Sequence, residues 1–144
     1  MSQPIQISFP GGKRVEARLG EYTVLTDLPA SAGGEGAGPG AFDLFLASIA
    51  SCAGTYALGF CHARGIATDG LSLTQTYEVN PESHLPTSIS IALHLPTSFP
   101  EKYRDAILRA VEGCKVKKTI AAAPTFNVQL SMEGADNVSP SHVQ

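Results

Sequence analysis

The segment between Gly40 and Gly65 constrains the fold more than any other part of this chain. It reads AFDLFLASIASCAGTYALGFCHAR and carries a single charge, Asp43, before His62. At ~1.5 Å per residue, an α-helix of this length spans roughly 36 Å, which is enough to cross a small domain. The sequence therefore predicts one long core helix with Cys52 near its middle.

The two faces of this predicted helix differ in side-chain size. On a helical projection, the face centred on Cys52 contains Ala41, Phe45, Ser48, Tyr56, Gly59 and Ala63. The opposite face contains mostly small residues, namely Asp43, Ala47, Ala50, Gly54, Ala57 and Cys61. Small residues spaced by four allow another helix to approach closely, which favours packing inside a core.

A membrane span is the main alternative for the same segment. Its length is just sufficient, but Asp43 and three hydroxyl side chains lie within it, and no second span or flanking basic cluster accompanies it. We therefore expect no membrane partner. Instead, a helix this apolar on every side needs more cover than one small sheet and one amphipathic helix supply, so we expect a second copy of the chain to cover it.

Composition bounds the class of protein. A chain of 144 residues with 43% hydrophobic residues predicts one globular domain, here residues 1–132, followed by a polar tail over residues 133–144 that we expect to be frayed. A net charge of −3 without a basic stripe argues against a nucleic-acid partner. The N-terminus does not read as a signal peptide, and three cysteines fit a reducing compartment, so we expect a cytoplasmic protein with free thiols.

Apolar periodicity predicts the remaining elements. Period-two alternation indicates strands over about 3–9, 15–19 and 22–26, then over 71–79 and 89–95 as a hairpin, and finally over 126–132. Ser98 and Glu101 have the spacing of a capping box, which predicts an amphipathic helix ending near Cys114 and one more helical turn over 115–123. The order of elements is that of an α+β domain.

The glycine-rich stretch 27–40, DLPASAGGEGAGPG, precedes the long helix. It resembles a phosphate-binding loop only superficially, because Pro39 stands where a dinucleotide pattern requires its third glycine and no Lys-Ser/Thr follows. We therefore expect a mobile loop and no nucleotide cofactor.

Cysteine is the strongest candidate for chemistry. Cys52 and Cys61 point about 180° apart and lie ~13 Å apart along one helix, which is too far for a disulfide. Cys114 is on a different element and is followed by three lysines within four residues, and a cationic neighbour favours a thiolate. A Cys52/Cys114 redox pair is thus one interpretation, and apolar core filling is the other.

Other site chemistries have weaker support. The cysteines lack metal-ligand spacing and the four histidines are scattered along the chain, so no metal is expected. A Cys/His hydrolase is not excluded by spacing, but no local protease signature is present.

Two stretches carry a family resemblance. GGEGAGPGAFDLFLASIASC, followed after about sixty residues by VEGCKVKKTI, is similar to the OsmC/Ohr family in its glycine-rich loop, its cysteine in a long helix and its second cysteine after an amphipathic helix. The resemblance covers residues 3–132. It implies an OsmC-like fold in which antiparallel sheets wrap around long central helices of an intertwined homodimer. It is closer to the broad OsmC-like group than to the Ohr branch.

The resemblance also implies an activity. It implies a thiol-dependent peroxidase with a role in stress response, in which Cys52 reduces an organic hydroperoxide, Cys114 resolves the oxidised cysteine as a disulfide and an external dithiol restores both thiols. In the Ohr branch, an arginine from the N-terminal strands activates the first cysteine. Arg14 or Arg18 would take that role here, and because Cys52 lies mid-helix we expect one of them to supply the charge that lowers its pKa.

Several positions depart from the peroxidase members. Phe42 stands where the Ohr branch has a glutamate that holds the arginine, and Lys-Val-Lys-Lys follows Cys114 where family members often have Pro-Val-His-Arg. These departures keep an alternative open, in which the chain is a dimeric module that binds a small apolar ligand and has no peroxidase activity.

Overall fold

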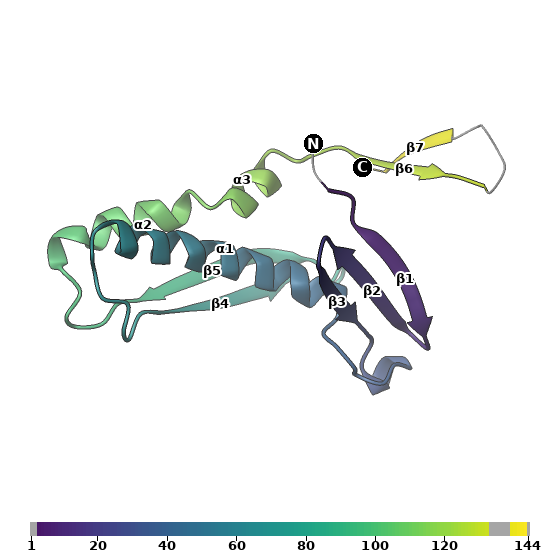
Figure 1. Ribbon diagram of the computed structural model, residues 1–144, viewed down its shortest axis with the longest axis horizontal. Coiled ribbons are helices and arrows are strands. Elements are labelled where there is room, and N and C mark those ends of the chain that lie inside the picture. Colours follow the sequence, from purple (N-terminus) through teal and green to yellow (C-terminus); the bar gives the residue numbers. More distant parts are fainter. Residues whose placement is uncertain (1–2, 133–138, 144) are drawn as a thin grey trace. The chain divides into compact units, whose positions relative to one another are not determined.

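The computed structural model describes residues 3–132 and the backbone of residues 139–143 (Figure 1). The chain forms two compact units, one made of the residues up to Ser51 with Leu73–Ala92, the other of Cys52–Ser72 with the residues from Leu93 onward. The described elements are helices and antiparallel strands, as expected for an α+β protein.

The first unit begins with a three-stranded antiparallel meander. It contains β1 (Gln6–Gly11), β2 (Arg14–Leu19) and β3 (Tyr22–Thr26), in the order β1-β2-β3. Gly12 and Gly20 occupy the two turns with φ of 58° and 59°, a region that L side chains rarely adopt. The predicted meander is therefore confirmed.

The glycine-rich stretch 27–40 is an ordered loop closed on the carboxylate of Asp27. Asp27 is 3% exposed; its Oδ1 accepts the Leu28 N–H at 2.7 Å, and its Oδ2 accepts the N–H groups of Glu35 and Ala37 at 3.2 and 3.0 Å. The Ala37 amide contributes most to holding the pKa of Asp27 below its ordinary 3.8, with smaller contributions from the other two amides and from the charge of Arg14, against the opposing effect of burial.

The loop also closes through its backbone. The Asp27 N–H donates to the Pro39 carbonyl at 3.2 Å, so the two ends of the stretch meet as in an Ω-loop, with the short 3₁₀ helix η1 (Ala30–Ala32) inside it. We expected a mobile connector from the glycine content. Glycine instead allows close contact between backbone segments of the loop. At Gly38, a Cβ would lie only 2.5 Å from the Leu25 carbonyl oxygen.

The long helix α1 (Ala41–Ala63) follows directly and confirms the predicted span. Asp43 in its first turn reaches back to accept the Gly40 N–H at 2.9 Å, which satisfies a free amide at the helix start. Within the described chain, the helix is buried along one stripe rather than all round. The buried residues are Leu46, Ile49, Ala53, Ala57, Phe60 and Cys61.

This stripe repeats every three to four residues, which is the pattern of a helix packed on one side. Large apolar side chains elsewhere on α1 remain exposed, including Phe42, Phe45, Tyr56 and Leu58. Among the described residues, α1 is the one helix that is long and apolar enough to cross a membrane. The core helix of a soluble protein has the same length and composition, so this property is weak evidence for a membrane span.

The hairpin β4 (Ser72–Val79) and β5 (Pro86–His94) is also as predicted. Its turn is built on Asn80, whose side-chain carbonyl accepts the N–H groups of Glu82 and Ser83 at 2.8 and 3.0 Å. Gln75 of β4 donates from Nε2 to the Leu46 carbonyl of α1 at 2.9 Å, a contact that strand periodicity did not predict.

The second unit continues with η2 (Glu101–Tyr103), α2 (Arg104–Glu112) and α3 (Lys115–Ala121). The predicted capping box is wrong: a 3₁₀ turn precedes α2, and neither helix start has a side-chain cap. The physical reason is that Pro100, extended at ψ 121°, is the residue that precedes the 3₁₀ turn, so the turn begins two residues later than a helix capped by Ser98 would. The expected apolar side of α2 is confirmed, with Ile107 and Val111 buried.

The last described elements are β6 (Phe126–Leu130) and β7 (Ser139–Val143), which pair as antiparallel strands. The expected frayed tail therefore contains a strand, while residues 133–138 and 144 lie outside the described residues. The assignment of 1–132 as one domain and 133–144 as a tail stays a prediction.

Candidate functional site

The two cysteines expected to form a redox pair lie in the same compact unit. Cys52 is in the middle of α1 and is part-buried, whereas Cys114 lies between α2 and α3 and is fully buried. A hydrogen bond joins their side chains. The chain thus brings together two thiols that are separated by sixty-two positions in the sequence.

The local backbone explains how Cys114 reaches Cys52. The chain leaves α2 at Gly113, is extended at Cys114 with φ −51° and ψ 127°, and re-enters a helix at Lys115. Because Cys114 is the residue immediately before α3, the first amides of that helix have no partner within it. The N–H groups of Lys115 and Val116 instead donate to Cys52.

These donors lower the pKa of the Cys52 thiol from its ordinary value. The hydrogen bond from the Cys114 thiol has the largest effect in lowering the pKa of Cys52, followed by the Val116 amide. Burial opposes this effect, and the Lys115 amide and the positive charge of Lys117 add to it. The arrangement therefore favours a thiolate at Cys52, with the side chain of Cys114 beside it.

Sequence reasoning did not find the contribution of the α3 amides. The signal was present in the order Gly113-Cys114-Lys115, because a glycine that ends one helix and a cysteine that precedes the next place the thiol among free amides. The lowered pKa of Cys52 therefore has sources in addition to the arginine that the sequence analysis expects.

Arg14 and Arg18 both belong to the other compact unit. Arg14 donates from Nε to the Gly11 carbonyl at 3.2 Å and its charge acts on Asp27, while Arg18 donates from Nη2 to Gln6 Oε1 at 3.3 Å. A role for either arginine toward Cys52 stays a prediction.

Cys61 has the character of a core residue. It is fully buried in α1, and this burial raises the pKa of its thiol, which is the opposite of what a nucleophile requires. Within the described ranges, no group of three or more histidine, cysteine or acidic side chains is placed to hold a metal ion.

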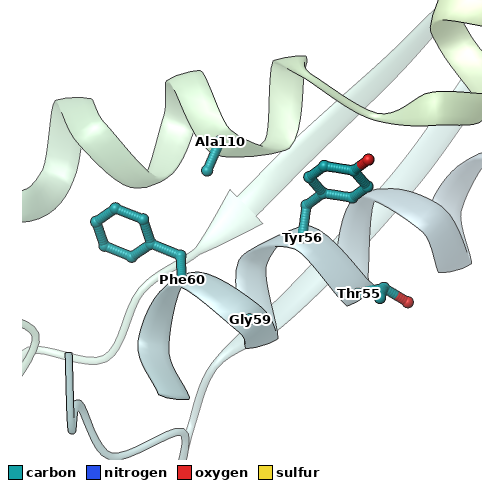
Figure 2. A pocket seen from close by; sticks show the side chains of 5 residues that line it. All are labelled: Thr55, Tyr56, Gly59, Phe60 and Ala110. Atoms are coloured by element: carbon teal, nitrogen blue, oxygen red, sulfur yellow. The ribbon is translucent and has the colours of Figure 1, made fainter. Parts of the chain in front are cut away.

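An apolar groove lies one to two helical turns beyond the cysteine pair. It has a volume of about 360 Å³ and is lined by Thr55, Tyr56, Gly59, Phe60 and Ala110. Figure 2 shows the first four on α1 and Ala110 on the neighbouring α2. Since Tyr56 is one turn after Cys52 and Ala110 is one turn before Cys114, the groove continues the line on which the two thiols meet.

Comparison with known proteins identifies the family. The family model described as OsmC-like protein matches residues 33–129, which include both cysteines and more than half of the chain. The chain belongs to the OsmC-like family. No curated protein matches the sequence.

Solved structures show the same fold. A protein from Psychrobacter arcticus 273-4, assigned to osmotic stress induction and detoxification response, aligns with a TM-score of 0.69 and 20% identity, covering 83% of this chain and 88% of its own. An organic hydroperoxide resistance protein OsmC from Legionella pneumophila, also described as a redox protein, aligns with a TM-score of 0.53 and 20% identity, covering 82% and 89%.

A third structure is that of an assigned organic hydroperoxide resistance protein from Vibrio cholerae, solved with captopril in one of its active sites. It aligns with a TM-score of 0.54 and 18% identity, covering 84% of this chain and 86% of its own. The expected OsmC-like α+β fold with antiparallel sheets is thus confirmed.

Proposed function

We propose that this OsmC-like protein is a thiol-dependent peroxidase that reduces organic hydroperoxides through Cys52 and Cys114. The observation that carries the proposal is the hydrogen-bonded cysteine pair, in which Cys52 has a lowered pKa and Cys114 is its largest cause. A thiolate is the reactive form toward a peroxide, and a neighbouring thiol is what resolves the product. The names of the Legionella and Vibrio structures support the same substrate class.

The reaction balances with these two thiols and one dithiol. The Cys52 thiolate attacks the outer peroxide oxygen, the O–O bond breaks, and the alkoxide leaves and takes a proton to become an alcohol. Cys52 is then a sulfenic acid. The Cys114 thiol attacks its sulfur, the S–S bond forms and water leaves, after which an external dithiol reduces the disulfide and is itself oxidised.

Arg14 or Arg18 would add positive charge near Cys52 if the N-terminal strands approach it, as the activating arginine does in the Ohr branch of the family. Phe42, in place of the Ohr glutamate, cannot accept a hydrogen bond from either arginine. The donors from Cys114 and α3 supply an alternative source of anion stabilisation in this chain.

The proposal includes a homodimer in the cytoplasm. Exposed apolar side chains on α1, such as Leu58 at 42% exposure, are the kind of surface that a second copy covers. Free thiols at all three cysteines fit a reducing compartment in which a dithiol is available.

The decisive experiment measures thiols and turnover together. Reduced protein is treated with one equivalent of cumene hydroperoxide, and intact mass, free thiols and peptides are then analysed. We expect two thiols to be lost and a Cys52–Cys114 bridge to form, with the same result in a Cys61→Ser control. In Cys52→Ser, turnover with dithiothreitol is expected to fall to background, and in Cys114→Ser, Cys52 is expected to overoxidise after one reaction.

A second candidate function is a dimeric module that binds a small apolar ligand without peroxidase activity. The apolar groove between α1 and α2 and the loss of the Ohr glutamate favour it. Three unreacted thiols after peroxide treatment would replace the peroxidase proposal with this one. Retained turnover in Cys52→Ser would refute Cys52 as the reacting cysteine.

A further inference from the structure

The three lysines of α3 are the densest cluster of positive charge in the sequence. Lys115, Lys117 and Lys118 lie within this short helix and account for three of the ten basic residues of the chain. No acidic residue stands between Glu112 and Glu133 in the sequence. Because the whole chain has a net charge of −3, the charge of α3 is opposite in sign to that of the protein.

The charge of these lysines is not neutralised within the chain. Lys115 and Lys118 are exposed and three residues apart, so they lie on the same side of α3, while Lys117 is part-buried. In the part of the chain that the structure describes, none of the three forms an ion pair with a carboxylate. Their charge is therefore open to an anionic partner from solution.

The same helix adjoins the cysteine pair. Lys118 is one helical turn after Cys114, and its N–H donates to the Cys114 carbonyl at 3.0 Å. The positive charge of Lys117 contributes to the lowered pKa of Cys52, so this lysine lies near that sulfur as well. Cys52 is part-buried and Cys114 is fully buried, so a reacting molecule from solution reaches Cys52 first and does so beside α3.

We propose that the lysines of α3 form a docking surface for an acidic protein whose dithiol reduces the Cys52–Cys114 disulfide. The inference rests on the proposed peroxidase function, which requires an external dithiol but does not specify its charge. Encounters between redox partners bury a small surface, and opposite charges raise their association rate by about 10- to 1000-fold at low ionic strength. A nucleic acid is also anionic, but it supplies no thiol, and three lysines give it few phosphate contacts.

The redox step balances with one dithiol. A thiolate of the partner attacks Cys52 Sγ, the S–S bond breaks, and Cys114 leaves as a thiolate that takes a proton. The second thiol of the partner then attacks the partner's own sulfur in the mixed disulfide, which releases Cys52. Two electrons and two protons thus pass from the dithiol to the cysteine pair, and the partner becomes a disulfide. The lysine side chains take no part in these bonds and act on the encounter alone.

The test separates docking from peroxidase turnover. The disulfide of the full-length protein is formed with diamide instead of a peroxide, and the second-order rate constant of its reduction is measured by rapid quench and free-thiol count. The probes are three synthetic peptides that share a Cys-Gly-Pro-Cys dithiol and differ in their flanking residues, which are glutamate, glutamine or lysine. Each rate is divided by the rate of the same peptide with 2-hydroxyethyl disulfide, which corrects for the reactivity of its thiols. At about 20 mM salt, we expect the glutamate peptide to react at least about tenfold faster than the lysine peptide, and at about 500 mM salt less than about twofold faster.

Variants of Lys118 assign the effect to α3. Lys118→Gln is expected to slow reduction by the glutamate peptide about threefold and Lys118→Glu about tenfold, whereas Lys118→Arg keeps the native rate because the charge remains. Reduction by dithiothreitol, which is uncharged, is expected to stay within about twofold of the native rate in all three variants. Arg104→Gln removes one positive charge from an exposed residue at the end of α2 that is far from Cys114, and it is expected to change the rate with the glutamate peptide less than about twofold.

A peptide that cannot react completes the test. A glutamate peptide with serine in place of both cysteines is expected to bind the reduced protein in fluorescence anisotropy, about threefold more weakly in Lys118→Gln, whether or not a peroxide forms the disulfide. Failure of the peroxidase proposal and failure of this one are therefore distinguishable. Equal normalised rates for the glutamate and lysine peptides, equal effects of Lys118→Gln and Arg104→Gln, or no binding of the serine peptide would each overturn the inference. Equally strong competition by a twelve-nucleotide single-stranded DNA would also overturn it, because α3 would then bind any polyanion.

Discussion

Replacing Gly34 with alanine tests the closed structure of the loop that precedes α1. An ideal Cβ at this position would lie 1.9 Å from the Leu28 carbonyl oxygen and 2.8 Å from Asp27 Oδ1. Contacts under 3.0 Å are essentially never seen for a Cβ, so the backbone at Leu28 must move by about 1 Å.

The cost of that movement follows from the bonds it disturbs. The Leu28 carbonyl accepts the Gly36 N–H at 3.0 Å, and Gly34 itself donates to the Pro29 carbonyl at 3.1 Å. Two weakened hydrogen bonds at ~1 kcal/mol each, with overpacking strain of ~1–3 kcal/mol, lower the free energy of unfolding by about 3–5 kcal/mol.

Gly36→Ala is the matched control in the same loop. Gly36 has φ +65°, but nothing lies within 4 Å of its ideal Cβ, so only backbone strain of ~1 kcal/mol is expected. For a domain of this size, we expect Gly34→Ala to lower Tm by about 10 °C and Gly36→Ala by about 3 °C.

Thermal unfolding followed by circular dichroism at equal protein concentrations measures both shifts, because the Tm of a self-associating protein depends on concentration. Equal Tm values for the two variants would refute the close approach of Gly34 to Leu28 and, with it, the closed loop.

Two further predictions concern the cysteine pair and self-association. Cys114→Ala removes the thiol that contributes most to lowering the pKa of Cys52. The pH midpoint for alkylation of Cys52 by iodoacetamide should therefore be higher in this variant than in the native protein. Identical pH profiles would contradict the hydrogen bond between the two cysteines. Leu58→Glu places a charge on the exposed face of α1 and, counted twice in a twofold interface, should weaken dimerisation at least about 100-fold in analytical ultracentrifugation. Leu108→Glu, a control at a comparably exposed position on α2, should leave association unchanged, and equal effects of the two substitutions would argue against α1 as the interface.

Local sequence patterns predicted the elements and nominated the cysteines. The run of apolar residues predicted α1 to within a residue of its ends, and alternation predicted the strands from β1 to β6, because both signals depend on neighbouring residues alone. It did not predict β7 in the polar tail. Cys52 and Cys114 were singled out by residue type and by resemblance. The Ser98 capping box failed because the same spacing is also compatible with a 3₁₀ turn, and local pattern does not choose between the two.

Only the tertiary structure decided how these elements act together. The fold decided which face of α1 is buried. It also brought the amides of Leu28, Glu35 and Ala37 to the Asp27 carboxylate, and the first amides of α3 to Cys52. The stacking of Arg64 on Phe60 beside Tyr103 is of the same kind. Periodicity sets which face of a helix is apolar, but the partner of that face, and hence the pKa of a thiol on it, depends on which distant segment packs there.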